Sequence, residues 1–231
     1  MLLEAYRHST ITYMNRNMLI AGGGIAGMAA GFAVARAGWQ TTVFEQAAEF
    51  SEVGAGVQLG PNVTRILQAW GLGDALKQVA AFPAGLHARS LATGEVLATL
   101  PLTDAVANYG APYVTLHRAD LHGLLLQAAA GEGVQVHSDA VVHRVFQTSD
   151  TVTFDVMQHD QLRQHTAPAS LAADGVWSRL RQQLLGDGLP AFTGHIAYRA
   201  LVAQADLPMH LRSQDVSVWM GSQAHVVSYP V

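Results

Sequence analysis

The amino-acid sequence predicts an α/β fold on two observations. Residues 17–45 contain a short apolar run (NMLIA) that ends at glycines, then small and apolar residues at helical spacing up to Gly38, then the β-branched and aromatic run QTTVFE. Residues 134–166 alternate apolar and polar side chains between short turns, and the run ASLAAD follows. The first pattern predicts strand, helix and strand of a parallel sheet. The second predicts a β-meander crossover that returns to a buried strand of that sheet.

Three glycines at the first strand-to-helix turn have the spacing G-x-G-x-x-G: Gly22, Gly24 and Gly27. The first permits a tight turn, the second lets backbone approach a pyrophosphate, and the third lets the helix pack close to the strand. The N–H groups at the helix start favour phosphate. Glu45, at the end of the second predicted strand, is placed to accept the hydroxyls of an adenosine ribose. This unit is therefore predicted to be Rossmann-like and to bind a dinucleotide.

A membrane anchor is the alternative interpretation of the same stretch. Met18–Ala35 carries no charge and follows Arg7 and Arg16, as in a signal anchor. The glycines weaken a lone helix in lipid, and the first ten residues, MLLEAYRHST, are polar and contain an acidic side chain. We therefore predict no integral membrane segment and a cytoplasmic location.

Composition excludes several classes of function. The net charge is -4 and no long run of Lys and Arg occurs, which argues against nucleic acid as a partner. The absence of cysteine excludes disulfides, zinc thiolates and thiol catalysis. Neither His117 with His122 nor His159 with His165 has ligand spacing on one helical face, so no metal site is predicted.

The remaining elements follow from local patterns. The run VTRILQAWG at 63–71 is typical of a helix, and HARSLATGEVLATL at 87–100 is typical of a hairpin about an Ala-Thr-Gly turn. No linker or repeat separates these elements, so two domains that interleave along the chain are expected.

After Glu45 the long segment QAAEFSEVGAGVQLGPN departs from the simple strand and helix repeat of an NAD dehydrogenase. From here the chain resembles the flavin-dependent aromatic monooxygenases, the class that includes salicylate and 3-hydroxybenzoate hydroxylases. Five blocks in the family's order carry the resemblance: GGGIAGMAAGFAVARAGWQTTVFEQ, EVGAGVQLGPN, HRADLHGLLLQAAAG, LAADGVWSRLR, and FTGHIAYRALV with AHVVSYPV. The Asp-Gly pair in the fourth block disfavours an NAD-only oxidoreductase.

The resemblance implies FAD as cofactor and NADH or NADPH as reductant. It places Val57 and Gln58 beside the flavin, and Arg118 at a helix start that approaches the cofactor. Asp174 and Gly175 fall where FAD and the incoming nicotinamide nucleotide are contacted. The predicted FAD-binding set is completed by the glycine turn and its acid: Gly22, Gly24, Gly27 and Glu45.

The resemblance also implies a reaction. A flavin hydroperoxide formed with dioxygen would hydroxylate a small aromatic acid such as salicylate or a hydroxybenzoate. His195 is the candidate base for the substrate phenol, Arg199 the candidate partner of its carboxylate, and Tyr198 a hydrogen-bonding or stacking residue. The structural alternatives stay open: a polar strand histidine, an arginine paired with an aspartate at a domain junction, and a core tyrosine.

The implied domains are an FAD-binding domain at 14–80 and 110–186 and a partial substrate domain, a β-sheet, at 81–109 and 187–231. By the same resemblance, 192–202 (FTGHIAYRALV) and 224–231 (AHVVSYPV) are predicted to be two strands of the substrate domain. Ala172 stands where the family has glycine, a change that an extended backbone tolerates and a left-handed one does not. The family's second FAD motif, a Gly-Asp pair, does not occur before Val231, so a C-terminally truncated member is expected. A homodimer and a complementing C-terminal polypeptide are both left open as partners. A non-catalytic FAD-binding remnant, or one half of a split enzyme, is the alternative function.

Overall fold

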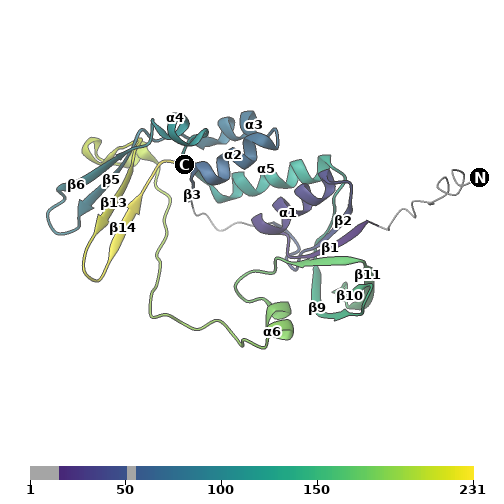
Figure 1. The fold of residues 1–231 in the computed structure, drawn as a ribbon. Coiled ribbons are helices and arrows are strands. Elements are labelled where there is room, and N and C mark those ends of the chain that lie inside the picture. Colours follow the sequence, from purple (N-terminus) through teal and green to yellow (C-terminus); the bar gives the residue numbers. More distant parts are fainter. Residues whose placement is uncertain (1–15, 51–55) are drawn as a thin grey trace, which may run out of the picture. The chain divides into compact units, whose positions relative to one another are not determined.

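The computed structural model describes residues 16–50 and 56–231, and these divide into two compact units. Unit 1 comprises the described residues of Met1–Phe50 together with Leu125–Phe192, and unit 2 those of Ser51–Leu124 together with Thr193–Val231. Each unit is thus built from two stretches that alternate along the chain (Figure 1). The α/β class is confirmed. The assignment of residues 14–80 and 110–186 to an FAD-binding domain, and of residues 81–109 and 187–231 to a substrate domain, stays a prediction.

The centre of unit 1 is a four-stranded parallel sheet in the order β12-β1-β2-β8. Its strands are β1 (Asn17–Ala21), β2 (Gln40–Phe44), β8 (Gln135–His137) and β12 (Ala169–Ala172). Helix α1 (Ile25–Arg36) connects β1 to β2, and α5 (Arg118–Gly131) precedes β8. The predicted strand, helix and strand at the N-terminal side of the chain are confirmed, as is the parallel return strand.

The two faces of this sheet are covered by different elements. Ile20 and Val43 lie near Gly31 of α1, because alternate strand residues point to opposite faces. Leu19 and Phe44 point the other way, into a core that is completed by residues of the meander and of helix α6 (Arg179–Leu185): Ala140, Val145, Phe154, Val156, Ala167 and Leu180. The meander therefore covers the sheet face opposite α1, as Figure 1 shows.

The meander consists of the antiparallel strands β9 (Ala140–Gln147), β10 (Val152–Gln158) and β11 (Gln161–Ala167), in the order β11-β10-β9. The β10–β11 turn is made by His159 and Asp160, both at positive φ, which suits a two-residue hairpin turn. A register shift interrupts the β9–β10 pairing beside Asp155. The predicted crossover meander is confirmed.

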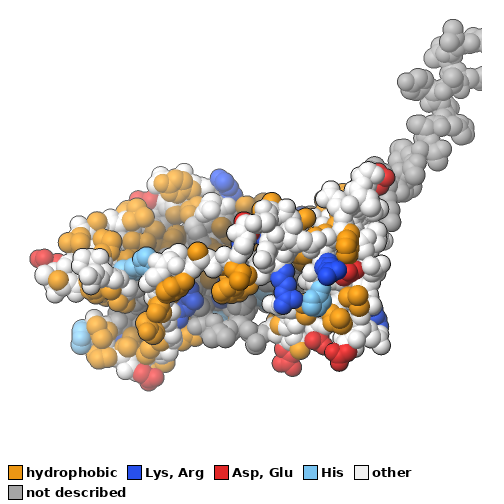
Figure 2. All heavy atoms as spheres, turned by 90° about the horizontal axis from the view of Figure 1, so that it is seen from below, with side chains coloured by type: hydrophobic (Ala, Val, Ile, Leu, Met, Phe, Trp, Pro, Cys, Tyr) orange, Lys and Arg blue, Asp and Glu red, His pale blue; other side chains and the backbone are white. Residues whose placement is uncertain are grey.

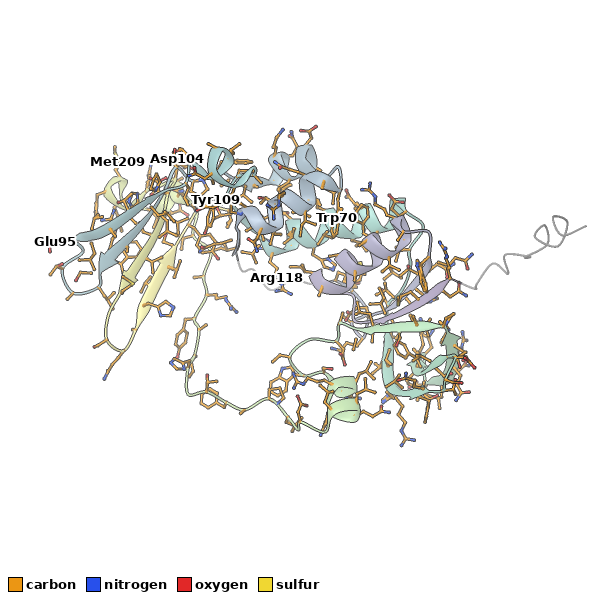
Figure 3. The ribbon with its side chains drawn as sticks, in the orientation of Figure 1. Trp70, Glu95, Asp104, Tyr109, Arg118 and Met209 are labelled. Carbon is orange, nitrogen blue, oxygen red and sulfur yellow. The ribbon has the colours of Figure 1, made fainter. Side chains whose placement is uncertain are left out.

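The described part of unit 2 contains a four-stranded and a three-stranded sheet, three short helices, the first half of α5 and two 3-10 turns. One sheet has the order β14-β13-β5-β6, with β5 (Gly85–Ser90), β6 (Val96–Pro101), β13 (Val216–Met220) and β14 (His225–Ser228). The other has the order β3-β7-β4, with β3 (Gly56–Leu59), β4 (Ala80–Ala81) and β7 (Val114–His117). The helices of unit 2 are α2 (Pro61–Ala69), α3 (Gly73–Val79) and α4 (Ala105–Tyr109), together with the first half of α5. Two 3-10 turns follow at Gln204–Asp206 and Met209–Leu211. Trp70 and Tyr109 mark the ends of α2 and α4 in Figure 3.

The hairpin predicted at 87–100 is confirmed by the antiparallel pairing of β5 with β6. Large hydrophobic side chains stay exposed on it, among them Leu97 and Leu100, and Figure 2 shows hydrophobic side chains on the surface of this part of the chain. None of the helices among the described residues combines the length and apolar character needed to span a bilayer.

The strand predicted at 192–202 is wrong. The segment is irregular and makes no strand pairing in the described part of the chain. Its β-prone side chains are largely exposed, with Ile196 at 70% and Tyr198 at 93% of full exposure. β-Propensity is realised only where a neighbouring strand and a packed face are available, and neither is present here. The sequence analysis also missed β13, the strand that joins β14 to β5.

Close packing between α1 and β1 depends on Gly27. A Cβ at this position would overlap the carbonyl oxygen of Gly22, which is backbone and cannot rotate away. We expect Gly27→Ala to lower the free energy of unfolding by about 2 kcal/mol or more. Gly123 in α5 is the matched control, since a Cβ there meets nothing within 4 Å. Gly123→Ala should be neutral or stabilising by up to about 1 kcal/mol. Urea unfolding followed by far-UV circular dichroism measures both, and equal effects would contradict the packing argument.

Candidate functional site

The turn after β1 is held by backbone contacts that only glycine permits. Gly22 has φ +99° and donates its N–H to the carbonyl of Phe44 at 2.8 Å. A Cβ on Gly22 would overlap the carbonyl oxygen of Ala173, which directly follows β12. The ends of β1, β2 and β12 therefore meet around a single glycine.

Helix α1 starts without a side-chain cap. Gly24 is its N-cap residue and has no side chain to cap the helix, and the first turn contains no acidic residue. A Cβ on Gly24 would meet no atom of the described residues within 4 Å, so these residues leave the space in front of Gly24 open. The first N–H groups of a helix have no intrahelical acceptor and carry the positive end of the helix dipole. The turn is thus an uncapped, open anion site.

Glu45 follows β2 and its carboxylate points at the glycine turn. Oε2 accepts a hydrogen bond from the N–H of Gly23 at 2.6 Å, and Oε1 accepts one from the N–H of Ala47 at 2.8 Å. The backbone N–H of Glu45 donates to the carbonyl of His137 at 2.8 Å, which fixes the residue at the end of the sheet. A carboxylate has about four acceptor positions, so two remain for hydroxyl donors.

The Asp174-Gly175 pair lies against the same turn. A Cβ on Gly22 would come within 2.9 Å of the backbone nitrogen of Asp174, so the two motifs are in backbone contact. Gly175 has φ +80°, a left-handed conformation that glycine adopts without strain. The structure therefore brings together six of the predicted FAD-binding residues within unit 1: Gly22, Gly24, Gly27, Glu45, Asp174 and Gly175.

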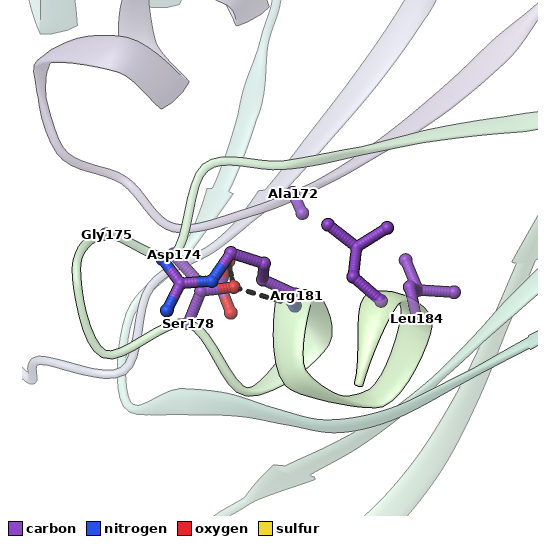
Figure 4. A pocket seen from close by; sticks show the side chains of 7 residues that line it. Ala172, Asp174, Gly175, Ser178, Arg181 and Leu184 are labelled. Atoms are coloured by element: carbon purple, nitrogen blue, oxygen red, sulfur yellow. Dashed lines mark hydrogen bonds between the residues drawn. The ribbon is translucent and has the colours of Figure 1, made fainter. Parts of the chain in front are cut away.

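The Asp174 carboxylate is engaged by the start of α6. It accepts hydrogen bonds from the Ser178 hydroxyl at 2.6 Å and from the N–H of Leu180 at 3.3 Å, and Ser178 in turn accepts one from the N–H of Arg181 at 2.9 Å. Figure 4 shows the contacts among Asp174, Ser178 and Arg181, which line a cavity of about 320 Å³ together with Ala172. The sequence analysis missed Ser178, although a serine before a helical run is a usual start signal.

Ala172 is the last residue of β12 and therefore extended. Positive φ values among the described non-glycine residues occur only at Asp139, His159 and Asp160. An alanine fits this backbone as well as a glycine does, so the departure from the family pattern costs no strain here.

Three other predicted FAD-binding residues lie in unit 2. Val57 and Gln58 are in β3, which pairs with β7 so that Gly56 lies opposite His117. Arg118 follows directly as the first residue of α5 and is labelled in Figure 3. The helix start is capped by His117, whose Nδ1 accepts a hydrogen bond from the N–H of Ala119 at 3.1 Å. The β3–β7 pairing therefore places Val57 and Gln58 in one small sheet, and Arg118 directly follows the end of β7 that lies opposite Gly56.

A tyrosine cluster adjoins Gln58 in unit 2. The Tyr113 hydroxyl donates to Oε1 of Gln58, and the ring of Tyr229 lies against Gly56, where a Cβ would overlap it. The Thr115 hydroxyl donates to the carbonyl of Pro230 at 2.6 Å, which holds the segment after β14 beside β7. The sequence analysis missed both tyrosines, because their proximity comes from strand pairing between distant segments.

Both phenols keep their protons more firmly than a free tyrosine. Burial raises the pKa of Tyr113, and the Tyr229 phenol raises it further. Burial also raises the pKa of Tyr229, and the positive charge of Arg199 partly offsets that rise. The cluster therefore presents neutral hydroxyl groups that donate and accept hydrogen bonds near neutral pH.

His195, Tyr198 and Arg199 lie in the irregular segment after unit 1 and are all exposed. Their side chains line neither of the two described cavities, and Arg199 is linked to the tyrosine cluster through its electrostatic effect on Tyr229. Their catalytic roles stay predictions. Among residues 16–50 and 56–231, no group of three or more His, Asp or Glu side chains is arranged to hold a metal ion.

The parallel sheet, the glycine turn at an uncapped helix and the acid after β2 define an α/β dinucleotide-binding protein. The sequence pattern of the FAD binding domain family matches residues 16–229, and the chain belongs to that family.

Curated relatives agree with this assignment. The chain is 37% identical over 225 residues to 3-hydroxybenzoate 6-hydroxylase 1 of Aquipseudomonas alcaligenes, a match that covers 94% of this chain and 55% of the relative. It is 35% identical over 212 residues to 6-hydroxynicotinate 3-monooxygenase of Pseudomonas fluorescens, a match that covers 91% of this chain and 54% of the relative. The resemblance to flavin-dependent aromatic monooxygenases is thereby confirmed. The chain spans about half the length of the curated relatives it matches.

Solved structures show the same fold. A variant of HpxO from Klebsiella pneumoniae complexed with FAD superposes with a TM-score of 0.73 at 22% identity, covering 93% of this chain and 54% of that one. A variant of 2-methyl-3-hydroxypyridine-5-carboxylic acid oxygenase superposes with a TM-score of 0.62 at 24% identity, covering 74% and 42%. At these sequence identities, the superpositions show that this chain shares the fold of these proteins.

The tyrosine cluster predicts a specific alkaline response. The pKa values of both phenols are raised in the folded state above the ordinary value of 10.0. The protonated phenols therefore contribute their full stability below about pH 10, and this contribution is lost as the pH rises through the folded pKa values. Tyr113→Phe should therefore reduce the loss of stability on going above about pH 10. Urea unfolding at stepped pH, with near-UV absorbance to follow phenolate formation, measures this. Tyr198→Phe, at an exposed tyrosine, is the control, and the same alkaline response in Tyr113→Phe as in wild type would refute the assignment.

Proposed function

We propose that the chain binds FAD through the glycine turn of unit 1 and belongs to an NADH- or NADPH-dependent monooxygenase of small aromatic acids. One observation carries the proposal: the start of α1 is open and uncapped at Gly24, with the Glu45 carboxylate fixed beside it. A pyrophosphate would be held by the N–H groups at the start of α1. The ribose hydroxyls would be held by the acceptor positions of the Glu45 carboxylate that Gly23 and Ala47 leave free.

The residues around this turn fit FAD in chemistry as well as shape. The space in front of Gly24 is what a close-lying diphosphate requires, and any side chain there would fill it. The Asp174 carboxylate accepts hydrogen bonds from Ser178 and Leu180. The backbone of Asp174 and the remaining acceptor positions of its carboxylate would contact the cofactor. By the family resemblance, Val57, Gln58 and Arg118 would contact the flavin part. When bound, the flavin would supply the redox and oxygen chemistry of the reaction.

The substrate class rests on the relatives. The names of the curated relatives, 3-hydroxybenzoate 6-hydroxylase and 6-hydroxynicotinate 3-monooxygenase, support a hydroxybenzoate-like aromatic acid, with dioxygen as co-substrate. Arg199 would pair with the substrate carboxylate, His195 would take the phenolic proton, and Tyr198 would contact the ring. We further propose a cytoplasmic location.

Sheet edges support an assembly with a second chain. In the sheet β14-β13-β5-β6, strands β14 and β6 each pair on one side only among the described strands. Unpaired edges accept further strands readily. A homodimer and a complementing C-terminal polypeptide both use such an edge, and sedimentation of the purified chain alone distinguishes them, because only the homodimer forms without a second polypeptide.

Turnover is tested by measuring NADH and NADPH consumption and product formation with 3-hydroxybenzoate and with salicylate in the presence of FAD. Hydroxylated product supports the monooxygenase. FAD binding with no product from any aromatic acid favours the alternative, a non-catalytic FAD-binding chain or one half of a split enzyme. A chain that binds no FAD contradicts both.

Cofactor binding is tested independently of folding by Gly24→Ala. Because a Cβ on Gly24 meets no protein atom, the fold should keep its stability, whereas the approach of the diphosphate is blocked. We expect FAD affinity, measured by quenching of flavin fluorescence, to fall at least about tenfold, or about 1.4 kcal/mol. Gly123→Ala should bind FAD as wild type does. Unchanged affinity in Gly24→Ala would place the cofactor elsewhere.

A further inference from the structure

A second cavity of unit 1 carries positive charge and lies away from the glycine turn. It has a volume of about 470 Å³ between β9 and α6 and is lined by His143, Arg144, Phe146, Arg179, Gln182 and Gln183. Figure 2 shows Lys or Arg side chains next to a histidine on the side of the molecule where α6 and β9 lie. The cavity near Asp174 is lined by other α6 residues, so the two cavities use different sides of this helix.

A β-bulge gathers the basic side chains. In the β9–β10 pairing, Val142 lies opposite Val156 and Arg144 opposite Asp155, so His143 is an extra residue in β9. Successive side chains of a regular strand point to opposite faces, whereas a bulge redirects one of them. His143 and Arg144 consequently line the same cavity although they are adjacent in sequence.

The opposite wall of the cavity is held in place by Gln183. Its side-chain amide accepts a hydrogen bond from the N–H of Val145 at 3.1 Å and donates one to the carbonyl of Val145 at 2.6 Å. The glutamine thereby pairs with the free edge of β9 as a neighbouring strand would, and it fixes α6 against that edge. Arg179 is carried by this fixed helix, and its Nη1 lies 3.4 Å from Nδ1 of His143.

The two arginines have no carboxylate partner. The described ion pairs involve other residues, and Asp155, opposite Arg144 in the strand pairing, accepts a hydrogen bond from the Gln164 amide at 2.9 Å. Two guanidinium groups that converge on one cavity suit a phosphate group, which accepts paired N–H donors. Phe146 is 46% exposed and offers a ring face for a base, and the Gln182 amide offers a donor and an acceptor for its edge.

We propose that this cavity binds a nucleotide, with its phosphate on Arg144 and Arg179 and its base against Phe146. The volume lies within the range of small-ligand pockets. A nucleic acid strand is disfavoured, because the charge is confined to one cavity and the chain is acidic overall at -4. The site is independent of the FAD site, which lies at the start of α1.

The test titrates ADP, adenosine and inorganic phosphate by calorimetry into the Gly24→Ala protein, in which ADP binding at the glycine turn is weakened and is the same for every variant compared. The control in the same background is Arg163→Gln, which removes an exposed arginine of unit 1 whose guanidinium donates to Gln161 and which lies outside the cavity lining. We expect ADP to bind at least about tenfold more weakly to the Arg144→Gln/Arg179→Gln variant than to the Arg163→Gln variant. Binding should weaken as salt rises.

Four outcomes decide the proposal. Loss of ADP binding in the double variant, with ADP binding kept in the Arg163→Gln variant, supports the proposal. Equal ADP binding by the double variant and by Arg163→Gln overturns it. Adenosine binding as tightly as ADP overturns the role of the phosphate, and inorganic phosphate binding as tightly as ADP assigns the cavity to free anions instead of nucleotides. Thermal unfolding of both variants confirms that the exposed substitutions leave the fold intact. None of these outcomes depends on whether the chain binds FAD.

Discussion

The close approach of three strand ends at Gly22 is the constraint on which unit 1 depends. The glycine N–H bonds to the end of β2, and the backbone after β12 lies where a side chain would otherwise be. Gly27 then allows α1 to lie directly on the same turn. A site for a diphosphate is consistent with this packing, because the N-cap residue of α1 is Gly24, which carries no capping side chain and leaves open space in front of the first N–H groups of the helix.

Glu45 connects the packing of the turn to its electrostatics. Its hydrogen bond from Gly23 stabilises the turn and at the same time holds a negative charge next to the positive end of α1. A carboxylate in this position favours a ligand that brings hydroxyl donors to it and keeps its phosphates over the neighbouring N–H groups. The geometry thus suits a dinucleotide, whose ribose hydroxyls can donate to the carboxylate, better than a simple anion such as phosphate, which brings no such donor.

The sequence predicted those parts of the fold that depend on local chemistry. The glycine spacing, the alternation of β9 to β11 and the apolar run of β12 each produce their element through turn geometry or through burial of one face, and the structure contains all of them. The prediction of a strand at 192–202 was wrong because these residues have β-propensity but no neighbouring strand among the described residues. The tyrosine cluster could not be predicted either. Tyr113 and Tyr229 come close only because β3, β7 and the segment after β14 meet in space.

Helix α6 shows how a motif residue can serve structure and function together. Asp174 and Ser178 fix the first turn of the helix from one side, and Gln183 fixes its last turns to the edge of β9 from another. A short helix held at both ends keeps its remaining side chains in defined positions, which a seven-residue helix could not do alone. The Asp-Gly motif therefore acts on its surroundings through α6 as well as on a cofactor directly. For this reason, loss of the Asp174 carboxylate would disturb the cavities on both sides of α6 together with any contact that it makes to FAD.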